Sequence, residues 1–145
     1  MDDIEAIKQL KARYFRLMDT KDWAGMRHVF SDDLVLEVED EGGVVHEGAD
    51  DFMAFLESVI GDVLTTHHGH MPEIQLTSAT TATGIWAMED QLWWTNGDAE
   101  EHLHGYGHYH ELYRLEGGQW LISYRKLTRL RVDTTPHFFD FLERR

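Results

Sequence analysis

The sequence predicts an α+β fold, in which helices near the N-terminus pack on a strongly curved, mainly antiparallel β-sheet that encloses a pocket. Apolar residues recur at helical spacing in the first part of the chain. From Thr65 onward they give way to β-branched and aromatic runs bounded by turn residues. Helices first and a long antiparallel meander last are typical of α+β domains, whose curved sheet leaves room for a pocket.

Three helices are predicted before the meander. The first carries an apolar stripe at three- and four-residue steps over residues 4–17. Asp22 is a suitable N-cap for a short second helix. A third helix is expected to open at Asp50 or Asp51 and to end near Gly61.

Strands are predicted in the rest of the chain. LVLEVE (residues 34–39) alternates as a half-buried strand does, and Gly42-Gly43 suggests a hairpin turn before VVHEG. The polar segment THHGHMP (residues 66–72) is expected to be a junction that leads into the meander. Phenylalanines in the tail should not be left in water, so the tail is expected over the pocket mouth or against a second subunit. The last four strands are predicted over residues 73–78, 81–94, 101–115 and 119–132.

Length and charge limit the classes of function. The 145 residues suit one domain, with a core of about residues 3–132 and a tail of 133–145. The 13 Lys and Arg against 27 Asp and Glu give a net charge of −14, which argues against nucleic acid and membranes as partners. No cysteine is present, so thiol chemistry is excluded. Without a secretory signal or an apolar run of about 20 residues, a soluble cytoplasmic protein is expected.

Ten histidines stand out in this acidic chain, and seven of them fall in two short windows. The first window is the junction of residues 66–72, and the second, HLHGYGHYH (residues 102–110), lies on a predicted strand. Because side chains alternate between the faces of a strand, the four histidines of the second window share one face. That face points either inward or outward, unless a bulge at Gly105 or Gly107 changes the register.

Three roles compete for these histidines. A metal site needs three or four converging ligands, and His68-Gly69-His70 followed by Glu73 is only a faint match to such a run. A catalytic imidazole fits better, because neutral histidine is the usual general base near neutral pH. Most of the ten are expected to be surface or strand residues without a catalytic task.

Five short segments together resemble the SnoaL-like branch of the NTF2-like superfamily, which includes scytalone dehydratase and the bile-acid 7α-dehydratases. The resemblance implies a cone-shaped α+β domain that forms a homodimer or homotrimer. It also implies a hydrophobic pocket that takes a small apolar molecule and works without a metal or an organic cofactor. The segments are YFRLMDTKDW (14–23), THHGHMP (66–72), WAMED (86–90), GHY (107–109) and GQWLI (118–122).

The resemblance assigns roles to three residues of the first two segments. Tyr14 matches a helix tyrosine that hydrogen-bonds the substrate oxygen, and Asp19 matches the aspartate five residues later. His67 matches the histidine that moves the proton. Independently of the resemblance, a carboxylate such as Asp19 at a helix C-terminus opposes the helix dipole and needs a compensating role.

Further roles fall on the strands. Asp90 matches a strand aspartate beside the catalytic histidine, and Arg129 matches an arginine of the last strand. His108 or His110 matches the second histidine of scytalone dehydratase. A carboxylate at Asp90, among apolar neighbours, is costly unless Arg129 or a histidine pairs with it.

The predicted function is a cofactor-independent lyase of the dehydratase type, or an isomerase, that acts on a small hydrophobic ring compound with a carbonyl group. His67 would move the proton, Asp19 or Asp90 would orient the imidazole, and Tyr14 would donate to the carbonyl oxygen. The alternatives are a non-catalytic small-molecule-binding module and a His-ligated metalloprotein. A carboxylate within about 3 Å of His67 favours the enzyme over the binding module.

Overall fold

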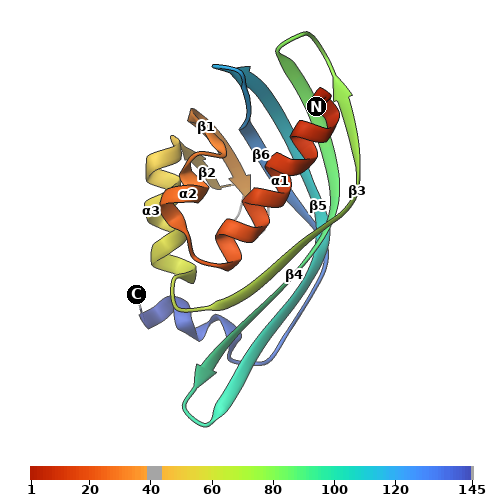
Figure 1. Cartoon of the computed structure of the whole chain (residues 1–145). Coiled ribbons are helices and arrows are strands. Elements are labelled where there is room, and N and C mark those ends of the chain that lie inside the picture. The colour runs from red at the N-terminus through yellow and green to blue at the C-terminus, as the bar shows by residue number, and fades with distance from the viewer. Residues whose placement is uncertain (39–43, 145) are drawn as a thin grey trace.

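The computed structural model describes residues 1–38 and 44–144, and it confirms the predicted α+β fold. In Figure 1, the helices α1 (Asp3–Asp19), α2 (Trp23–Arg27) and α3 (Ala49–Ile60) lie on one side of a curved sheet. The strand order is β2-β1-β6-β5-β4-β3, with β1 and β6 parallel and the other neighbours antiparallel. The strands are β1 (Phe30–Val38), β2 (Val44–Glu47), β3 (Leu64–Leu76), β4 (Thr81–Asn96), β5 (Ala99–Glu116) and β6 (Gln119–Thr134).

The helices begin and end close to the predicted residues. Asp22 caps α2 as predicted, since its Oδ1 accepts a hydrogen bond from the Gly25 backbone N at 2.9 Å. The predicted opening of the third helix at Asp50 or Asp51 is wrong, because the helix begins at Ala49 with Gly48 as its N-cap and both aspartates lie in the first turn. None of the described helices is long and apolar enough to cross a membrane. The predicted turn at Gly42-Gly43 lies outside the described residues.

The junction predicted at residues 66–72 is wrong, because this segment lies inside β3 and pairs with β4. Histidine and glycine have little strand propensity, so the pairing with β4 decides the conformation here. The register shifts between Gly69 and Pro72, where a bulge accommodates a proline that has no N–H for the ladder. As a consequence, His67 lies directly opposite Asp90 on β4.

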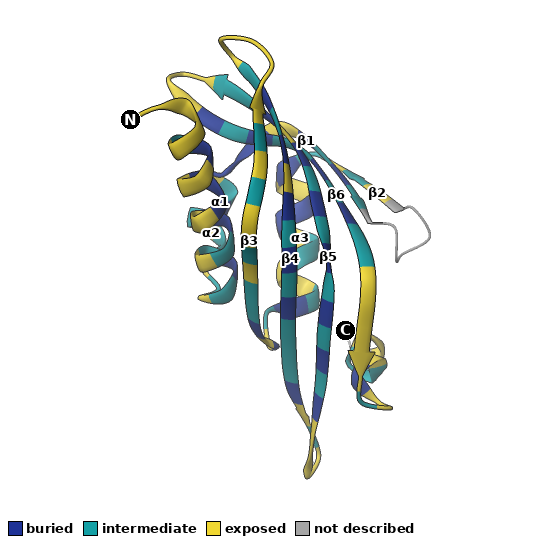
Figure 2. Cartoon of the chain, turned by 90° about the vertical axis from the view of Figure 1, so that its right-hand side faces the viewer, coloured by how far each residue is buried: buried dark blue, intermediate teal, exposed yellow. Residues whose placement is uncertain are grey.

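The strand β5 shows which face of the second histidine window points inward. Its odd-numbered residues are buried over 101–113, and the four histidines lie half-buried at even positions. Figure 2 shows this alternation along β4 and β5. The register shift between Tyr106 and Gly107 places the extra residue in β6, not in β5. His108 and His110 therefore lie on the face away from the helices, which contradicts a role for either inside the pocket.

The C-terminal tail covers one end of the helix side of the sheet. It forms the 3₁₀ helix η2 (Phe138–Arg144), beside the lower end of α3 in Figure 1. Phe138 is buried, and its carbonyl oxygen accepts a hydrogen bond from Trp94 Nε1 at 2.7 Å. Thr135 Oγ1 donates to Glu101 Oε1 at 2.6 Å and fixes the start of the tail. The tail lies at the cavity described below, which is one of its two expected placements.

Candidate functional site

Asp19 and His67 form the first pair of the site. Asp19 ends α1, and His67 lies on β3, which packs against α1. His67 Nδ1 lies 2.7 Å from Asp19 Oδ1, and the His67 backbone N donates to Asp19 Oδ2 at 2.8 Å. An ionised carboxylate only accepts hydrogen bonds, so Nδ1 is the donor to Asp19, and in a neutral imidazole with this tautomer the lone pair is on Nε2. The pair holds the imidazole as a general base would need to be held.

Asp90 and Arg129 form the second pair. The Asp90 side chain is 5 % exposed, and it accepts hydrogen bonds from Arg129 Nη1 at 2.8 Å and Nη2 at 3.0 Å. Such two-point contacts are the strongest that a guanidinium makes with a carboxylate. His67 Nε2 lies 3.9 Å from Asp90 Oδ2, which is beyond hydrogen-bond distance. The structure therefore makes Arg129 the hydrogen-bond partner of Asp90, and it also brings His67 Nε2 to 3.9 Å from the same carboxylate.

A glycine makes the second pair possible. Asp90 on β4 and Arg129 on β6 lie on either side of β5, and their side chains meet over Gly105. A Cβ on Gly105 would lie 2.5 Å from Asp90 Oδ1 and closer still to Arg129 Nη1. From the sequence, Gly105 was expected only as a place for a bulge. The signal that could have found its role is a glycine at an inward-facing position of a long strand, where it otherwise weakens the sheet.

A cavity of about 690 Å³ opens beside Asp90 and Arg129, which are the charged side chains of its lining. Aliphatic residues of α3 and of the sheet form most of the remaining wall. A few polar groups in a largely apolar wall are typical of small-molecule sites, and this volume lies within their usual range. The tail closes the cavity with Phe138, Phe139, Phe141 and Leu142.

Tyr14 does not join this site. It is fully buried, its hydroxyl accepts a hydrogen bond from Arg125 Nη1, and it is not among the residues that line the cavity. Burial raises the pKa of Tyr14, and the nearby Arg125 opposes this rise. The structure contradicts the expectation that Tyr14 donates to a substrate oxygen. The apolar stripe of α1 carries Tyr14 into the core, and Arg129 is the cation beside the cavity.

Two residues behind Asp19 were missed from the sequence. Thr65 Oγ1 donates to Asp19 Oδ1 at 2.9 Å, and Lys21 Nζ donates to Thr65 Oγ1 at 2.9 Å. Thr65 lies two residues before His67 on β3, so both side chains face the same side of the sheet. In the sequence, the position of Thr65 two residues before His67 was the available sign that the two side chains share a face of the strand.

Other histidines of the two windows lie on the outer face of the sheet. Glu89 contacts His70 Nε2 at 3.1 Å and His104 Nε2 at 2.8 Å through its two oxygens. Both contacts lower the pKa of Glu89, and the hydrogen bond with His104 has the larger effect. Within residues 1–38 and 44–144, no three His, Asp or Glu side chains are arranged so that they could hold a metal ion.

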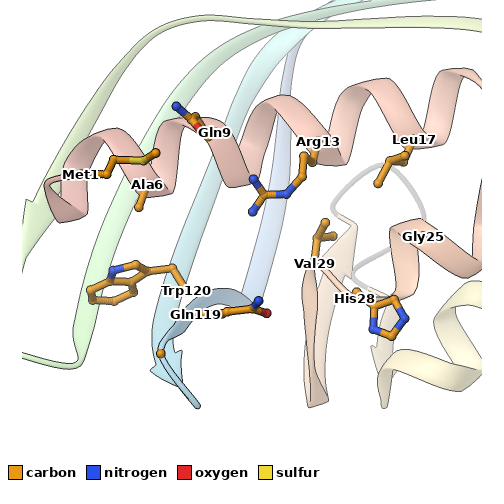
Figure 3. A pocket seen from close by; sticks show the side chains of 11 residues that line it. Met1, Ala6, Gln9, Arg13, Leu17, Gly25, His28, Val29, Gln119 and Trp120 are labelled. Carbon is orange, nitrogen blue, oxygen red and sulfur yellow. The ribbon is translucent and has the colours of Figure 1, made fainter.

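A second cavity, of about 410 Å³, lies between α1, α2 and the start of β6. Figure 3 shows Arg13 on α1 and Gln119 and Trp120 on β6 at its border. Its lining includes neither member of the Asp19–His67 pair and neither member of the Asp90–Arg129 pair. It is therefore separate from the candidate site.

Comparisons with known proteins agree with this architecture. The model of the SnoaL-like domain family matches residues 1–126. The chain is 26 % identical to a protein of unknown function from Mycobacterium tuberculosis, with a TM-score of 0.75 over 89 % of this chain and 72 % of that one. It is 22 % identical to a candidate scytalone dehydratase from Novosphingobium aromaticivorans, with a TM-score of 0.78 over 90 % and 86 % of the two chains. It is 16 % identical to the hexachlorocyclohexane dehydrochlorinase LinA-type3 from Novosphingobium barchaimii, with a TM-score of 0.76 over 91 % and 89 %.

Proposed function

We propose, since the chain belongs to the SnoaL-like domain family, that its cavity carries out a cofactor-independent elimination on a small hydrophobic ring compound. The observation that carries this proposal is the 2.7 Å contact between Asp19 and His67, whose Nε2 faces the Asp90–Arg129 pair at the cavity. This contact meets the criterion that favours an enzyme over a binding module. Two proteins of the same fold are named as a dehydratase and a dehydrochlorinase, which supports elimination as the reaction class.

The proposed reaction begins with a proton transfer to His67. Its Nε2 removes a carbon-bound proton beside a carbonyl group, and Asp19 stabilises the resulting imidazolium through Nδ1. The electron pair of the broken C–H bond forms a C=C bond as the bond to a β-hydroxyl breaks. The imidazolium then gives its proton to the departing hydroxyl, which leaves as water. The Arg129 guanidinium stabilises the negative charge that develops on the carbonyl oxygen.

The charges at the cavity favour a neutral substrate. The carboxylate of Asp90 balances the guanidinium of Arg129, so the pair adds no net charge to the cavity. A carboxylic acid would gain little from such a neutral pair, whereas an apolar ring would gain from the aromatic side chains of η2. The proposed substrate is therefore an uncharged ring compound with a carbonyl and a leaving group.

The function is tested with uncharged cyclic ketones that carry a hydroxyl or a chloride β to the carbonyl. We expect a conjugated C=C bond, followed by its ultraviolet absorbance, together with one equivalent of released water or chloride. The rate should be the same in excess chelator. Movement of a double bond without release of a group would make the protein an isomerase, and binding of these ketones without turnover would favour the binding module.

Replacement of Gly105 by alanine is expected to lower kcat/KM by about 10- to 100-fold and to destabilise the fold by about 1–3 kcal/mol. The added methyl group collides with Asp90 Oδ1 and pushes Arg129 away from the cavity. Turnover of the same ketones and urea unfolding measure the two effects.

The matched control is Gly84→Ala on the neighbouring strand, where a Cβ would lie 2.6 Å from Tyr113 Oη. It should cost stability without a comparable loss of turnover, because Gly84 does not lie between Asp90 and Arg129. Equal turnover in Gly105→Ala and the unsubstituted protein would remove the ion pair from the reaction.

A further inference from the structure

The backbone at Lys21 is in an unfavourable conformation. Lys21 is the one non-glycine residue of the described chain, residues 1–38 and 44–144, with a positive φ, which is 63°. It ends α1 in a Schellman motif, because Lys21 N donates to Met18 O and Asp22 N donates to Leu17 O. Glycine is the usual residue at this position, since a Cβ is strained there. Because a lysine here strains the backbone, we expect its side chain to make a contact that a glycine could not make.

The side chain of Lys21 is connected to the Asp19–His67 pair by hydrogen bonds through Thr65. Its Nζ donates to Thr65 Oγ1 at 2.9 Å, and Thr65 is buried. An ammonium group has only donors, so the Thr65 hydroxyl must accept from Lys21 and give its own proton to Asp19 Oδ1, 2.9 Å away. The same Asp19 oxygen accepts the hydrogen bond from His67 Nδ1 at 2.7 Å. Three hydrogen bonds in series therefore join the ammonium to the imidazole.

We propose that Lys21 is a positioning residue, which sets how tightly the Asp19–His67 pair holds a proton by fixing the Thr65 hydroxyl and by adding a positive charge beside Asp19. The proposal rests on the proposed function only for the use of His67 as a base. Lys21 does not line the cavity and is not placed to touch substrate. Its effect therefore reaches the reaction through Asp19.

The charges around His67 give the direction of the effect. Within the part of the chain that the structure describes, Asp19 at the end of α1 and Asp90 on β4 are the carboxylates that lie within 4 Å of the imidazole nitrogens. Arg129 on β6 binds Asp90. Lys21 is joined to Asp19 by the hydroxyl of Thr65, which accepts from Lys21 and donates to Asp19. Burial lowers the pKa of Lys21, while the attraction of Asp19 raises it. Without the Lys21 cation, the carboxylate of Asp19 would favour the imidazolium more strongly, so His67 would become protonated at a higher pH.

The sharpest test is Lys21→Gly, because it removes the ammonium and also relieves the strained backbone. We expect unchanged or higher thermal stability. The midpoint of the His67 ring titration, followed by NMR in the protein without substrate, should rise by about 0.5 pH units, roughly threefold in proton affinity. The acid limb of the pH–rate profile should move in the same direction, with the maximal rate within about threefold of its original value.

Two other variants make the titration specific. Lys21→Met keeps the aliphatic stem and should give the same upward shift, whereas Arg16→Gln removes an exposed cation from the last turn of α1. The Arg16→Gln midpoint should stay within about 0.1 units of the unsubstituted protein. A Lys21→Gly midpoint that is unchanged or lower overturns the role of Lys21. Because no substrate is present in the titration, that outcome is separate from failure of the proposed elimination.

Discussion

Replacement of His67 by alanine is expected to lower kcat by about 10²- to 10⁴-fold and to change KM little, which is the usual effect of losing a general base, the role proposed for this residue. The imidazole is 8 % exposed, and Asp19 holds it through Nδ1 with Nε2 toward the Asp90–Arg129 pair. Among the described residues that line the cavity there is no histidine, and His67 Nε2 lies 3.9 Å from Asp90 Oδ2, which is part of the lining. The change is measured by steady-state kinetics on the ketone that turns over.

The matched control is His108→Ala. His108 is half-buried on the outer face of β5, so its removal should leave kcat within about twofold of the original value. If both alanine variants lose activity equally, the loss reflects general damage to the sheet and His67 has no special role.

Replacement of Lys11 by methionine is expected to lower the free energy of unfolding by about 3–5 kcal/mol. Lys11 Nζ lies 2.7 Å from Glu111 Oε2, and both side chains are completely buried. The other carboxylate oxygen of Glu111 accepts a hydrogen bond from Tyr113 at 2.6 Å. Methionine has a similar shape but leaves the Glu111 carboxylate without its cation. Urea unfolding followed by circular dichroism measures the loss.

The double variant Lys11→Met/Glu111→Leu separates the cost of an unpaired charge from that of lost packing. It should regain most of the stability, because the partner charge is removed as well. A double variant as unstable as Lys11→Met would show that the loss comes from packing alone.

The same pair predicts a pH dependence of stability. Burial lowers the pKa of Lys11 from 10.5 to about 8, although Glu111 partly opposes this. Between about pH 8 and pH 10 the unfolded chain keeps this proton while the folded protein releases it. The unfolded state then binds more protons, so the Lys11 contribution to the free energy of unfolding rises with pH, by about 1–2 kcal/mol from pH 7.5 to 9.5. Urea unfolding at these two pH values should show the rise in the unsubstituted protein and not in Lys11→Met.

Local pattern predicted most of the fold. The apolar stripe of α1 and the two-residue alternation of β4, β5 and β6 depend on neighbours in the sequence. The strand at residues 64–76 was predicted only from residue 73, since His67 and its polar neighbours become a strand through pairing with β4. The long-range pairing overrode a weak local preference.

Sequence separation explains what could be predicted of the site. Asp19 and His67 lie 48 residues apart, and only the resemblance brought them together before the packing of α1 on β3 was known. The sequence carries only weak signals for Thr65 and Gly105 and none for Lys21, because the role of each depends on side chains that are distant in the sequence. Lys11 was missed for the same reason, since its partner Glu111 is 100 residues away.

The most direct test of the account is a double-mutant cycle for kcat with Asp19→Asn and His67→Ala. Asp19→Asn alone is expected to lower kcat by about 10²-fold or more, because the amide no longer stabilises the imidazolium. If Asp19 acts through His67, adding Asp19→Asn to the His67→Ala variant should lower kcat by less than about a further twofold. Losses that multiply in the double variant would contradict the account, because Asp19 and His67 would then act independently of each other.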